Sequence, residues 1–420
     1  ALKARVLLYQ ASPLFNGNAF YSDFKNKNGE LLFNSTYDRN KWLLAAEAAD
    51  KAVEICEGSD RALITGSTGK KTDLLNVMAD VENSMFSRFT NEEYLLEWKY
   101  TNTFHKFTLP RLVGDDKNFD AQAVGCLSPS MKMVEMYYTE NGLPIDADIT
   151  WNYSNRYKLG SESSPEYEGV IPMNTSVVNL HLRREPRFYA SIAGDRMYWQ
   201  RGTNTAQDDY NLLVEAHKGE VPWGTQYDFI ISNSWQNING YWLKKHLFSW
   251  FQTLGYSNNL QGNETAAIIR LAEVYLMQSE AWNEYLDQPD SRVYDPIDKV
   301  RERAGILPVR EAWGSYSNNP TKVTTKVGMR EIIHQEYNIE FAFEGHRYWN
   351  LRRWLIAHQI LNEKQYGWNV IGTTDQAFYN YETGPVVVWS SNKFVAPRDY
   401  LTPFDAEEIL ISGMVQNPQW

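Results

Sequence analysis

Apolar residues recur with helical spacing in several stretches of the chain. The stretch 40–57, "NKWLLAAEAADKAVEICE", shows this spacing on an alanine-rich background, as does the opening segment, and 91–107 shows it more weakly. The spacing is clearest in 264–286, "ETAAIIRLAEVYLMQSEAWNEYL". The apolar residues on one arc of that helix are Ile268, Leu271, Ala272, Tyr275, Trp282 and Leu286. Each of these stretches is predicted to form a helix.

Two further helices are predicted at 295–305 and 328–345. Pro296 favours a helix start and Gly305 a helix end, because proline fits the first turn and glycine adopts the left-handed conformation that stops a helix. Small Ala and Ser residues alternate with large ones in these paired helices. That pattern is typical of tetratricopeptide-like hairpins, although no regular repeat is preserved.

Long irregular stretches lie between and after the helical blocks, at about 108–262 and 361–420. They are rich in Gly, Asn, Ser, Tyr and Trp, and loops of this length in a compact protein usually carry function. The predicted fold is therefore mostly α. It is a single domain over 1–420, in which a tetratricopeptide-like helical hairpin scaffold at about 1–107 and 264–358 carries long, irregular, aromatic-rich insertions.

A stripe of carboxylates marks the last predicted helix. Glu336, Glu340 and Glu344 follow one another at four-residue spacing, and Arg347 joins them if the helix continues past Gly345. Apolar residues flank the stripe, so we expect it to be partly buried and paired with cations, since an unpaired buried charge costs several kcal/mol. The arginines expected to supply partners are Arg347, Arg352, Arg353, Arg301 and Arg303.

This stripe is interpreted as a structural ion network. A glycosidase needs two carboxylates on different elements, one on each side of the bond that is cut. Glutamates on one face of one helix all point the same way, which argues against catalysis, and ligand binding is the remaining alternative.

Charge and composition narrow the function further. Lys and Arg total 41 against 52 Asp and Glu, a net charge of −11, which disfavours binding to nucleic acid. No run of apolar residues is long enough to cross a bilayer as a helix. Cys56 and Cys126 are too few for a disulfide framework. The chain opens with "ALKARVLLYQASPLF", which reads as the middle of a helix, so we expect that upstream sequence is missing.

Sequence motifs for catalysis or metal binding are weak. "TGSTGKKT" at 65–72 has two residues between its glycines where a phosphate-binding loop needs four. The seven histidines show no metal-ligand spacing, and no Gly-x-Ser-x-Gly motif occurs. Asp146 and Asp148 allow a structural calcium loop, but a solvated loop is the favoured interpretation. We therefore predict no enzymatic activity, no bound metal and no cofactor.

Aromatic residues are abundant, with 15 Trp, 26 Tyr and 18 Phe. Flat rings suit the C–H faces of sugars, and polar or charged side chains suit their hydroxyls. Both types occur together at 150–157, 195–204, 222–229 and 233–242, with a second-choice loop at 366–382. The candidate ligand-binding residues are Trp151, Tyr153, Tyr198, Trp199, Arg201, Trp223, Trp235 and Tyr241.

Several stretches resemble, in the same order, segments of the SusD/RagB family of outer-membrane nutrient-binding lipoproteins. "EFAFEGHRYWNLRRW" at 340–354 resembles the end of the family's last helical repeat, and "RREPRFYASI" at 183–192 resembles its Arg-Asp-Pro-Arg-Phe signature, with Glu185 in place of Asp. The other matching segments are "ALKARVLLYQASPLFNG", "SPSMKMVEMYYTENGLPI", "IIRLAEVYLMQSEAWNE", "IDKVRERAGI" and "YLTPFDAEEILISGMVQNPQW". Phe404 and Asp405 depart from the family's usual Ile-Pro, and the family's N-terminal portion has no counterpart.

This resemblance implies a SusD-like fold and a lipid-anchored protein at the cell surface, on the outer membrane. The family's members capture a glycan, or in some cases a peptide, and deliver it to a SusC-like TonB-dependent transporter. The lipid anchor would lie on the missing N-terminal part. Glycan binding is the leading hypothesis, peptide binding is the first alternative, and a glycoside hydrolase is the less favoured one.

Overall fold

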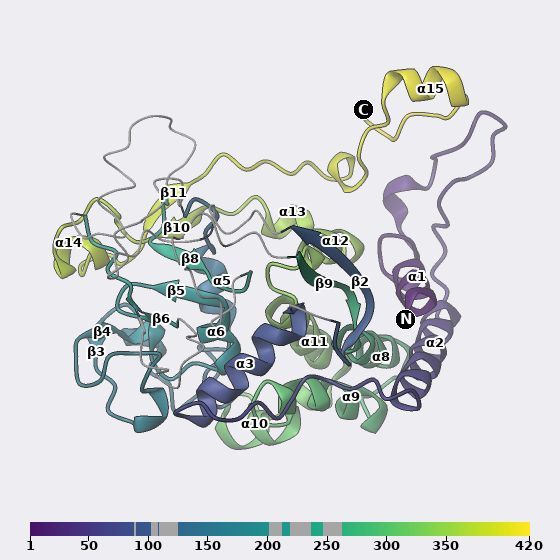
Figure 1. The fold of residues 1–420 in the computed structure, drawn as a ribbon. Helices are drawn as coiled ribbons and strands as arrows, with labels where there is room; N and C mark the ends of the chain where they lie inside the picture. The colour runs from purple at the N-terminus through teal and green to yellow at the C-terminus, as the bar shows by residue number, and fades with distance from the viewer. Residues whose placement is uncertain (88–89, 102–107, 109–124, 201–211, 219–236, 247–262) are drawn as a thin grey trace.

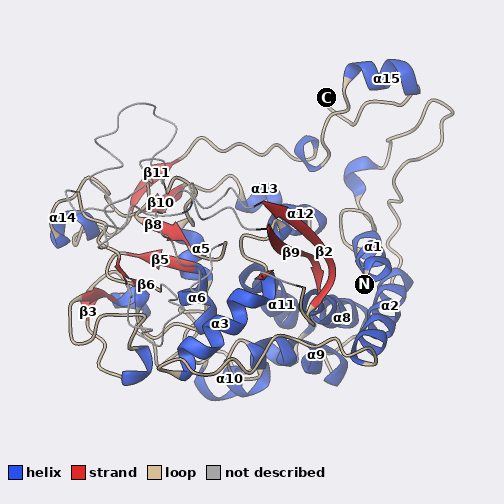
Figure 2. Cartoon of the chain, in the orientation of Figure 1, coloured by secondary structure: helices blue, strands red, loops and turns tan. Residues whose placement is uncertain are grey.

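Helices dominate the computed structural model, and its strands are short (Figures 1 and 2). The structure describes residues 1–87, 90–101, 108, 125–200, 212–218, 237–246 and 263–420. The prediction of a mostly α fold is confirmed. Within the described residues, no helix is both long enough and apolar enough to cross a membrane.

The helical scaffold is built from α1 (Leu2–Ala11), α2 (Asn40–Glu57), α8 (Leu271–Tyr285) and α9 (Ser291–Arg303). Helix α2 packs against α1 on one side and α8 on the other, and α8 in turn packs against α9. The small residues predicted to mediate such packing are buried in α2: Ala45, Ala46 and Ala49. Their size lets neighbouring helices approach closely, so these helices share one apolar core.

The predicted helix at 91–107 is wrong where the structure describes it, because β2 (Tyr94–Thr101) occupies that stretch. The prediction at 264–286 is wrong at its start, because β9 (Asn263–Arg270) precedes α8. The two strands pair antiparallel, and β1 (Phe86–Ser87) pairs with the other edge of β9. β-Branched and aromatic residues favour strands when a partner strand is available, and here the partner is far away in the sequence. Ile268, placed on the helical arc by its spacing, is 43% exposed in the strand.

Helix α9 begins earlier than predicted. Asp290 caps it by accepting a hydrogen bond from the backbone N–H of Arg292, so Pro296 lies inside the helix and does not mark its start. The predicted stop at Gly305 agrees with the structure, where this residue has a φ of +70°. Helix α10 (Val309–Tyr316) follows.

The predicted helix at 328–345 consists of α11 (Lys326–Glu340) and a tight turn. Gly345, with a φ of +82°, precedes a separate helix, α12 (His346–Arg353). Because the chain changes direction before Gly345, Arg347 leaves the carboxylate stripe.

The other half of the molecule, on the left in Figures 1 and 2, has its own core, which is formed by helices and two-stranded pairs from several parts of the sequence. Its helices are α3 (Asp73–Met85), α5 (Met131–Met136), α6 (Pro186–Ser191) and α14 (Asp375–Tyr379). Its antiparallel pairs are β3 (Leu159–Gly160) with β4 (Val177–Val178), β5 (Ile192–Gly194) with β8 (Tyr241–Leu243), β6 (Tyr198–Trp199) with β7 (Leu212–Leu213), and β10 (Gln365–Gly367) with β11 (Val386–Trp389).

A small third core joins the N-terminal and C-terminal segments, and it includes Leu14, Tyr21, Leu351 and Tyr400. After α13 (Ala357–Ile360) and the β10–β11 pair, the chain ends in α15 (Ala406–Ser412), which projects from the body (Figure 1). The 3₁₀ turns are η1 (Ala19–Tyr21), η2 (Tyr153–Asn155), η3 (Pro165–Tyr167), η4 (Asn179–His181), η5 (Lys322–Thr324) and η6 (Arg398–Tyr400).

Candidate ligand-binding site

Glu336 belongs to a network of buried ion pairs. It accepts a 2.6 Å hydrogen bond from Arg187 and a 3.1 Å hydrogen bond from Arg301. Arg187 in turn pairs with Glu185 at 2.7 Å and with Glu340 at 2.9 Å. None of these side chains is more than 2% exposed, so their charges are balanced within the protein and not by solvent.

Glu340 and Glu344 extend this network toward β9. Arg270 contacts Glu340 at 2.5 Å and Glu344 at 2.9 Å, while Arg303 binds Glu340 and Lys245 binds Glu344 at 2.7 Å. Burial alone would raise the pKa of Glu340, but Arg303, Arg270 and Arg187 hold it well below its usual value. Arg270 and Lys245 likewise outweigh burial and lower the pKa of Glu344 to about 2.

The whole set, called here the buried ion network, contains five carboxylates and five cations. Its members are Glu93, Glu185, Glu336, Glu340 and Glu344 with Arg187, Lys245, Arg270, Arg301 and Arg303. Of the expected partners, Arg301 and Arg303 take part. The network ties six segments of the chain together and leaves no carboxylate of the stripe facing solvent.

The other expected partners lie elsewhere. The expectation that Arg347 extends the stripe is wrong, because α12 turns it away and its guanidinium donates to Asn338 at 2.7 Å. Arg353 pairs with Glu280 at 2.6 Å, and Arg352 lies 3.6 Å from the centre of the Tyr348 ring.

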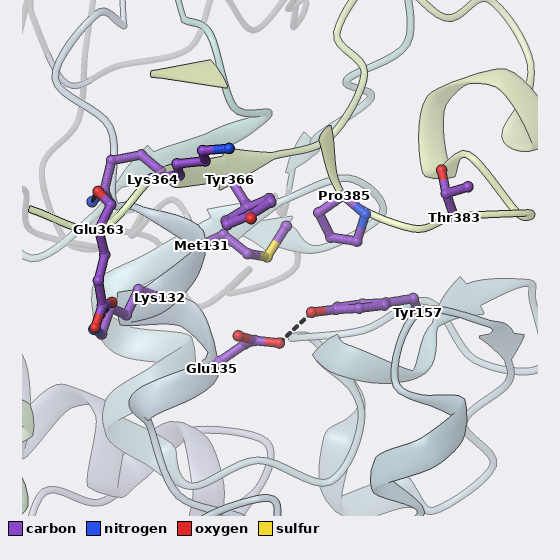
Figure 3. Close-up of a pocket in the computed structure, with 10 residues that line it drawn as sticks. Met131, Lys132, Glu135, Tyr157, Glu363, Lys364, Tyr366, Thr383 and Pro385 are labelled. Atoms are coloured by element: carbon purple, nitrogen blue, oxygen red, sulfur yellow. Dashed lines mark hydrogen bonds and ion pairs between the residues drawn. The ribbon is translucent and has the colours of Figure 1, made fainter. Parts of the chain in front are cut away.

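The candidate site is a pocket of about 590 Å³ on the other half of the molecule (Figure 3). Four segments that are distant in sequence form its walls: α5, the end of the 150–157 stretch, β10 with the residues before it, and the residues after α14. The lining residues are Met131, Lys132, Glu135, Tyr157, Glu363, Lys364, Gln365, Tyr366, Thr383 and Pro385.

One wall of the pocket is fixed by Glu135. Its Oε1 atom accepts a 2.5 Å hydrogen bond from the Tyr157 hydroxyl and a 2.9 Å bond from Nε of Arg156. The Arg156 guanidinium lies 4.2 Å from the centre of the Tyr157 ring and 4.0 Å from that of Tyr153, so it is sandwiched between them. Burial, with the hydrogen bond to Glu135, raises the pKa of Tyr157, so its hydroxyl remains a donor.

The opposite wall carries Tyr366, whose ring is 45% exposed (Figure 3). Tyr366 pairs across the β10–β11 ladder with Val387, which is 48% exposed. Trp389, two residues further on the same face of β11, is 50% exposed. The hairpin thus presents two aromatic rings and an apolar side chain at the edge of the pocket.

Polar groups complete the pocket. Lys132 and Glu363 form an ion pair at one end, and Thr383 supplies a hydroxyl at the other (Figure 3). Lys364 lies on the same side as Tyr366. Aromatic rings, hydrogen-bond donors and hydrogen-bond acceptors therefore all line the same pocket.

The predicted residues are distributed unevenly around this pocket. Tyr153 adjoins it through Arg156 and is 40% exposed. Trp151 is partly buried and donates its indole N–H to the Leu182 carbonyl at 3.1 Å. Tyr198 is partly buried, whereas Trp199 is 6% exposed and packs in the core. The other candidates, Arg201, Trp223 and Trp235, lie outside the described residues.

Tyr241 is a core residue. It is 0% exposed, and its hydroxyl accepts a 2.9 Å hydrogen bond from the Trp368 indole. That hydroxyl lies 3.0 Å from Nε2 of His181, whose Nδ1 lies 3.1 Å from the Asp195 carbonyl. A carbonyl can only accept, so Nδ1 carries the proton and Nε2 accepts from Tyr241. This hydrogen-bond chain gives Tyr241 a structural role in place of the predicted ligand contact.

Sequence reasoning missed most of the pocket. Tyr157 and Tyr366 stand in the stretches 150–157 and 366–382 that drew attention, but neither was singled out. Glu135 and Lys132 lie on a short helix with no signal of their own. Only the convergence of the four segments identifies them.

The carboxylate of Asp148, considered above for a calcium loop and assigned to a solvated loop, is buried and bonded to protein groups. The carboxylate of Asp148 accepts hydrogen bonds from Thr139 at 2.6 Å, Asn141 at 3.0 Å and the Thr150 hydroxyl at 2.7 Å. In the part of the chain that the structure describes, no group of three or more His, Cys, Asp or Glu residues could hold a metal ion.

Comparison with known proteins supports the resemblance seen in the sequence. "SusD-like protein P25" of Formosa agariphila is 32% identical over 117 residues, which are 28% of this chain and 20% of that protein. "SusD-like protein P2" of the same organism is 26% identical over 183 residues, or 42% of this chain and 30% of that protein. The aligned regions therefore span less than a third of either relative.

Solved structures share the fold. BT4246 superposes with a TM-score of 0.79 at 24% identity, covering 100% of this chain and 70% of its own. A SusD-like carbohydrate binding protein, BF0978 from Bacteroides fragilis, superposes with a TM-score of 0.55 at 20% identity, covering 89% of this chain and 61% of its own. The sequence profile of the SusD family matches residues 85–420. This chain therefore belongs to the SusD family.

Proposed function

We propose that this chain binds a glycan in the pocket between α5 and the β10–β11 hairpin. The observation that carries the proposal is the arrangement of Tyr157 and Tyr366 on opposite walls, with Glu135, Gln365 and Thr383 between and beside them. Rings on two walls can stack on the faces of a sugar unit while the polar groups bind its hydroxyls.

The exposed hairpin face suits a ligand longer than one sugar. Trp389 and Val387 continue the apolar surface from Tyr366 outward. Tyr153, held by Arg156, does the same beside Tyr157. An oligosaccharide could therefore occupy the pocket with one unit and rest on these rings with its neighbours.

Family membership supports the cellular role. We propose that the whole protein is a lipid-anchored component of the outer-membrane surface that passes glycan to a SusC-like TonB-dependent transporter. BF0978, which shares the fold, is described as a carbohydrate binding protein. A peptide ligand is the alternative within the same role, but the pocket's rings and scattered polar groups suit sugars better than an extended backbone.

A hydrolase is disfavoured although two carboxylates line the pocket. Glu135 is held by Arg156 and Tyr157, and Glu363 is held by Lys132. A glycosidase needs one carboxylic acid ready to donate a proton and one carboxylate free to act as base or nucleophile. Both groups here are committed to ion pairs with cations.

Calorimetric titration of the chain against polysaccharides and their oligosaccharides, with product analysis of each mixture, tests the proposal. We expect heat of binding with at least one glycan, no released sugar, and weaker binding in Tyr366→Ala. Tyr37→Ala, which removes another exposed ring, in the segment just before α2 and not among the residues that line the pocket, is the matched control. Released sugar would establish a hydrolase, and the absence of binding heat with every glycan tested would contradict the glycan proposal.

A further inference from the structure

The charges around the pocket do not balance. The chain as a whole carries 11 more carboxylates than Lys and Arg side chains. The residues that line the pocket include as many cations as carboxylates, and with the adjoining residues counted the cations exceed the carboxylates by one. The cations are Lys132, Arg156, Lys158 and Lys364, and the carboxylates are Glu135, Glu363 and Glu382.

The ion pairs leave one lining cation over. Arg156 pairs with Glu135, and Lys132 pairs with Glu363. The Lys158 ammonium donates to the backbone carbonyl of Tyr381 at 2.8 Å. Among the described residues, the exposed Lys364 ammonium has no hydrogen-bond or ion-pair partner.

The neighbouring carboxylate does not neutralise Lys364. Glu363, next in sequence, belongs to Lys132, and the largely buried Arg347 adds a second attractive charge to Glu363. Lys364 lies with Tyr366 along one side of the pocket, facing the wall formed by Glu135 and Tyr157 (Figure 3). An unpaired cation is thus held beside an exposed ring.

We propose that the sugar bound in this pocket carries an anionic group, a carboxylate or a sulfate ester, and that Lys364 is its partner. The proposal rests on the glycan-binding function proposed above and adds the class of glycan. A uronate or sulfated sugar offers an apolar face for Tyr366 and a charged substituent for Lys364 at the edge of the same ring. A charge-assisted hydrogen bond of this kind is stronger than one to a neutral hydroxyl.

The net negative charge of the chain favours binding of the anionic group at Lys364 over binding elsewhere on the surface. A chain with a net charge of −11 repels an acidic polysaccharide overall, so an unpaired cation at the pocket directs the anionic groups of the polysaccharide to one place. Electrostatic attraction to Lys364 is screened by salt, because the group is exposed. Binding should therefore weaken as the ionic strength rises, whereas stacking on Tyr366 should not.

Matched glycan pairs test the proposal by calorimetry with the full chain. The acidic probes are polygalacturonate, alginate, chondroitin sulfate and carrageenan, each compared with its carboxyl-reduced or desulfated derivative, beside neutral starch and laminarin. The variants are Lys364→Gln, Lys364→Arg and, as a control for net charge, Lys3→Gln on α1, across the molecule from the pocket. Both positions are exposed, and thermal melting verifies that each variant folds.

We expect at least one acidic polysaccharide to bind about tenfold more tightly than its carboxyl-reduced or desulfated derivative, with the preference lost in Lys364→Gln and kept in Lys364→Arg and Lys3→Gln. Loss of affinity on carboxyl reduction identifies a uronate, and loss on desulfation identifies a sulfate ester. A neutral glycan bound most tightly, weakened by Tyr366→Ala but not by Lys364→Gln, would overturn the anionic class and leave the proposed function standing. Binding to no glycan would overturn both.

Discussion

The hydroxyl of Tyr157 donates a 2.5 Å hydrogen bond to Glu135, and this bond sets the angle of the ring in the pocket wall. The ring is also held by Arg156 on one face and meets Trp368 edge-on, with 5.8 Å between ring centres. Three contacts of different kinds therefore orient one aromatic plane before any ligand arrives, which lowers the entropy cost of binding.

Two variants of Tyr157 should separate the contribution of the ring's fixed orientation to glycan affinity from the contribution of its stacking. Tyr157→Phe keeps the ring but loses the bond to Glu135, and we expect glycan affinity to fall by a few fold, roughly 0.5–1.5 kcal/mol. Tyr157→Ala removes the ring and should cost about tenfold or more. Calorimetry with the glycan found in the titration panel measures both. Equal affinities in all three proteins would remove Tyr157 from the site.

The buried ion network should be essential to stability. Glu340→Gln removes a buried carboxylate that Arg187, Arg270 and Arg303 all contact, so these cations are no longer fully balanced in the interior, and we expect the free energy of unfolding to fall by about 3–5 kcal/mol. Urea denaturation at neutral pH measures the change. Glu331→Gln on the same helix is the control. The Glu331 side chain pairs with Lys322 but is 60% exposed, so this substitution should cost about 1 kcal/mol or less. Similar losses in both variants would contradict the role given to the network.

Acid should weaken the fold through His181. Burial lowers the pKa of this ring to about 3, against about 6.5 in the unfolded chain. The unfolded chain therefore binds a proton that the folded one does not, and stability is lost as the pH falls from about 6.5 toward 3, at about 1.4 kcal/mol per pH unit. Unfolding free energies at pH 7, 6 and 5 should show a shallower decline in His181→Gln, whose side-chain amide does not titrate. Parallel declines of the unfolding free energy in the wild type and in His181→Gln would contradict this role of His181.

Two glycines should respond to alanine in opposite directions. An added Cβ would contact nothing within 4 Å at either Gly345 or Gly314. Gly345 has a φ of +82°, so Gly345→Ala should cost about 1–2 kcal/mol through backbone strain. Gly314 lies inside α10, where alanine should add about 0.5–1 kcal/mol. Thermal melting of both variants checks the signs, and a shared sign would show that local space, not backbone conformation, decides.

Local signals in the sequence predicted what is local in the structure. The bounds of α2 follow from apolar spacing alone, and the spacing of Glu336, Glu340 and Glu344 predicted a stripe on one helix. The partners Arg187 and Arg270 could not be inferred, because they come from other elements far along the chain.

The errors have the same origin. "TAAIIRL" and "EYLLEW" read equally well as helix or strand, and only the pairing of β2 with β9 across the fold decides between them. Aromatic richness marked the right region for the site. It could not distinguish Tyr241, whose hydroxyl is used inside the core, from Tyr366, whose ring is exposed, since burial depends on the tertiary fold.

The buried ion network also constrains how the chain can reach its native state. Arg187 is 149 residues from Glu336, and Arg270 is 70 residues from Glu340. As the polypeptide leaves the ribosome, these arginines emerge long before α11 delivers the carboxylates that neutralise them. Until then Arg187 has only Glu185 and Arg270 only Glu93 as a network carboxylate, so the buried charges of both halves are balanced only when the last quarter of the chain arrives. We therefore expect the two halves of this protein to fold as one cooperative unit.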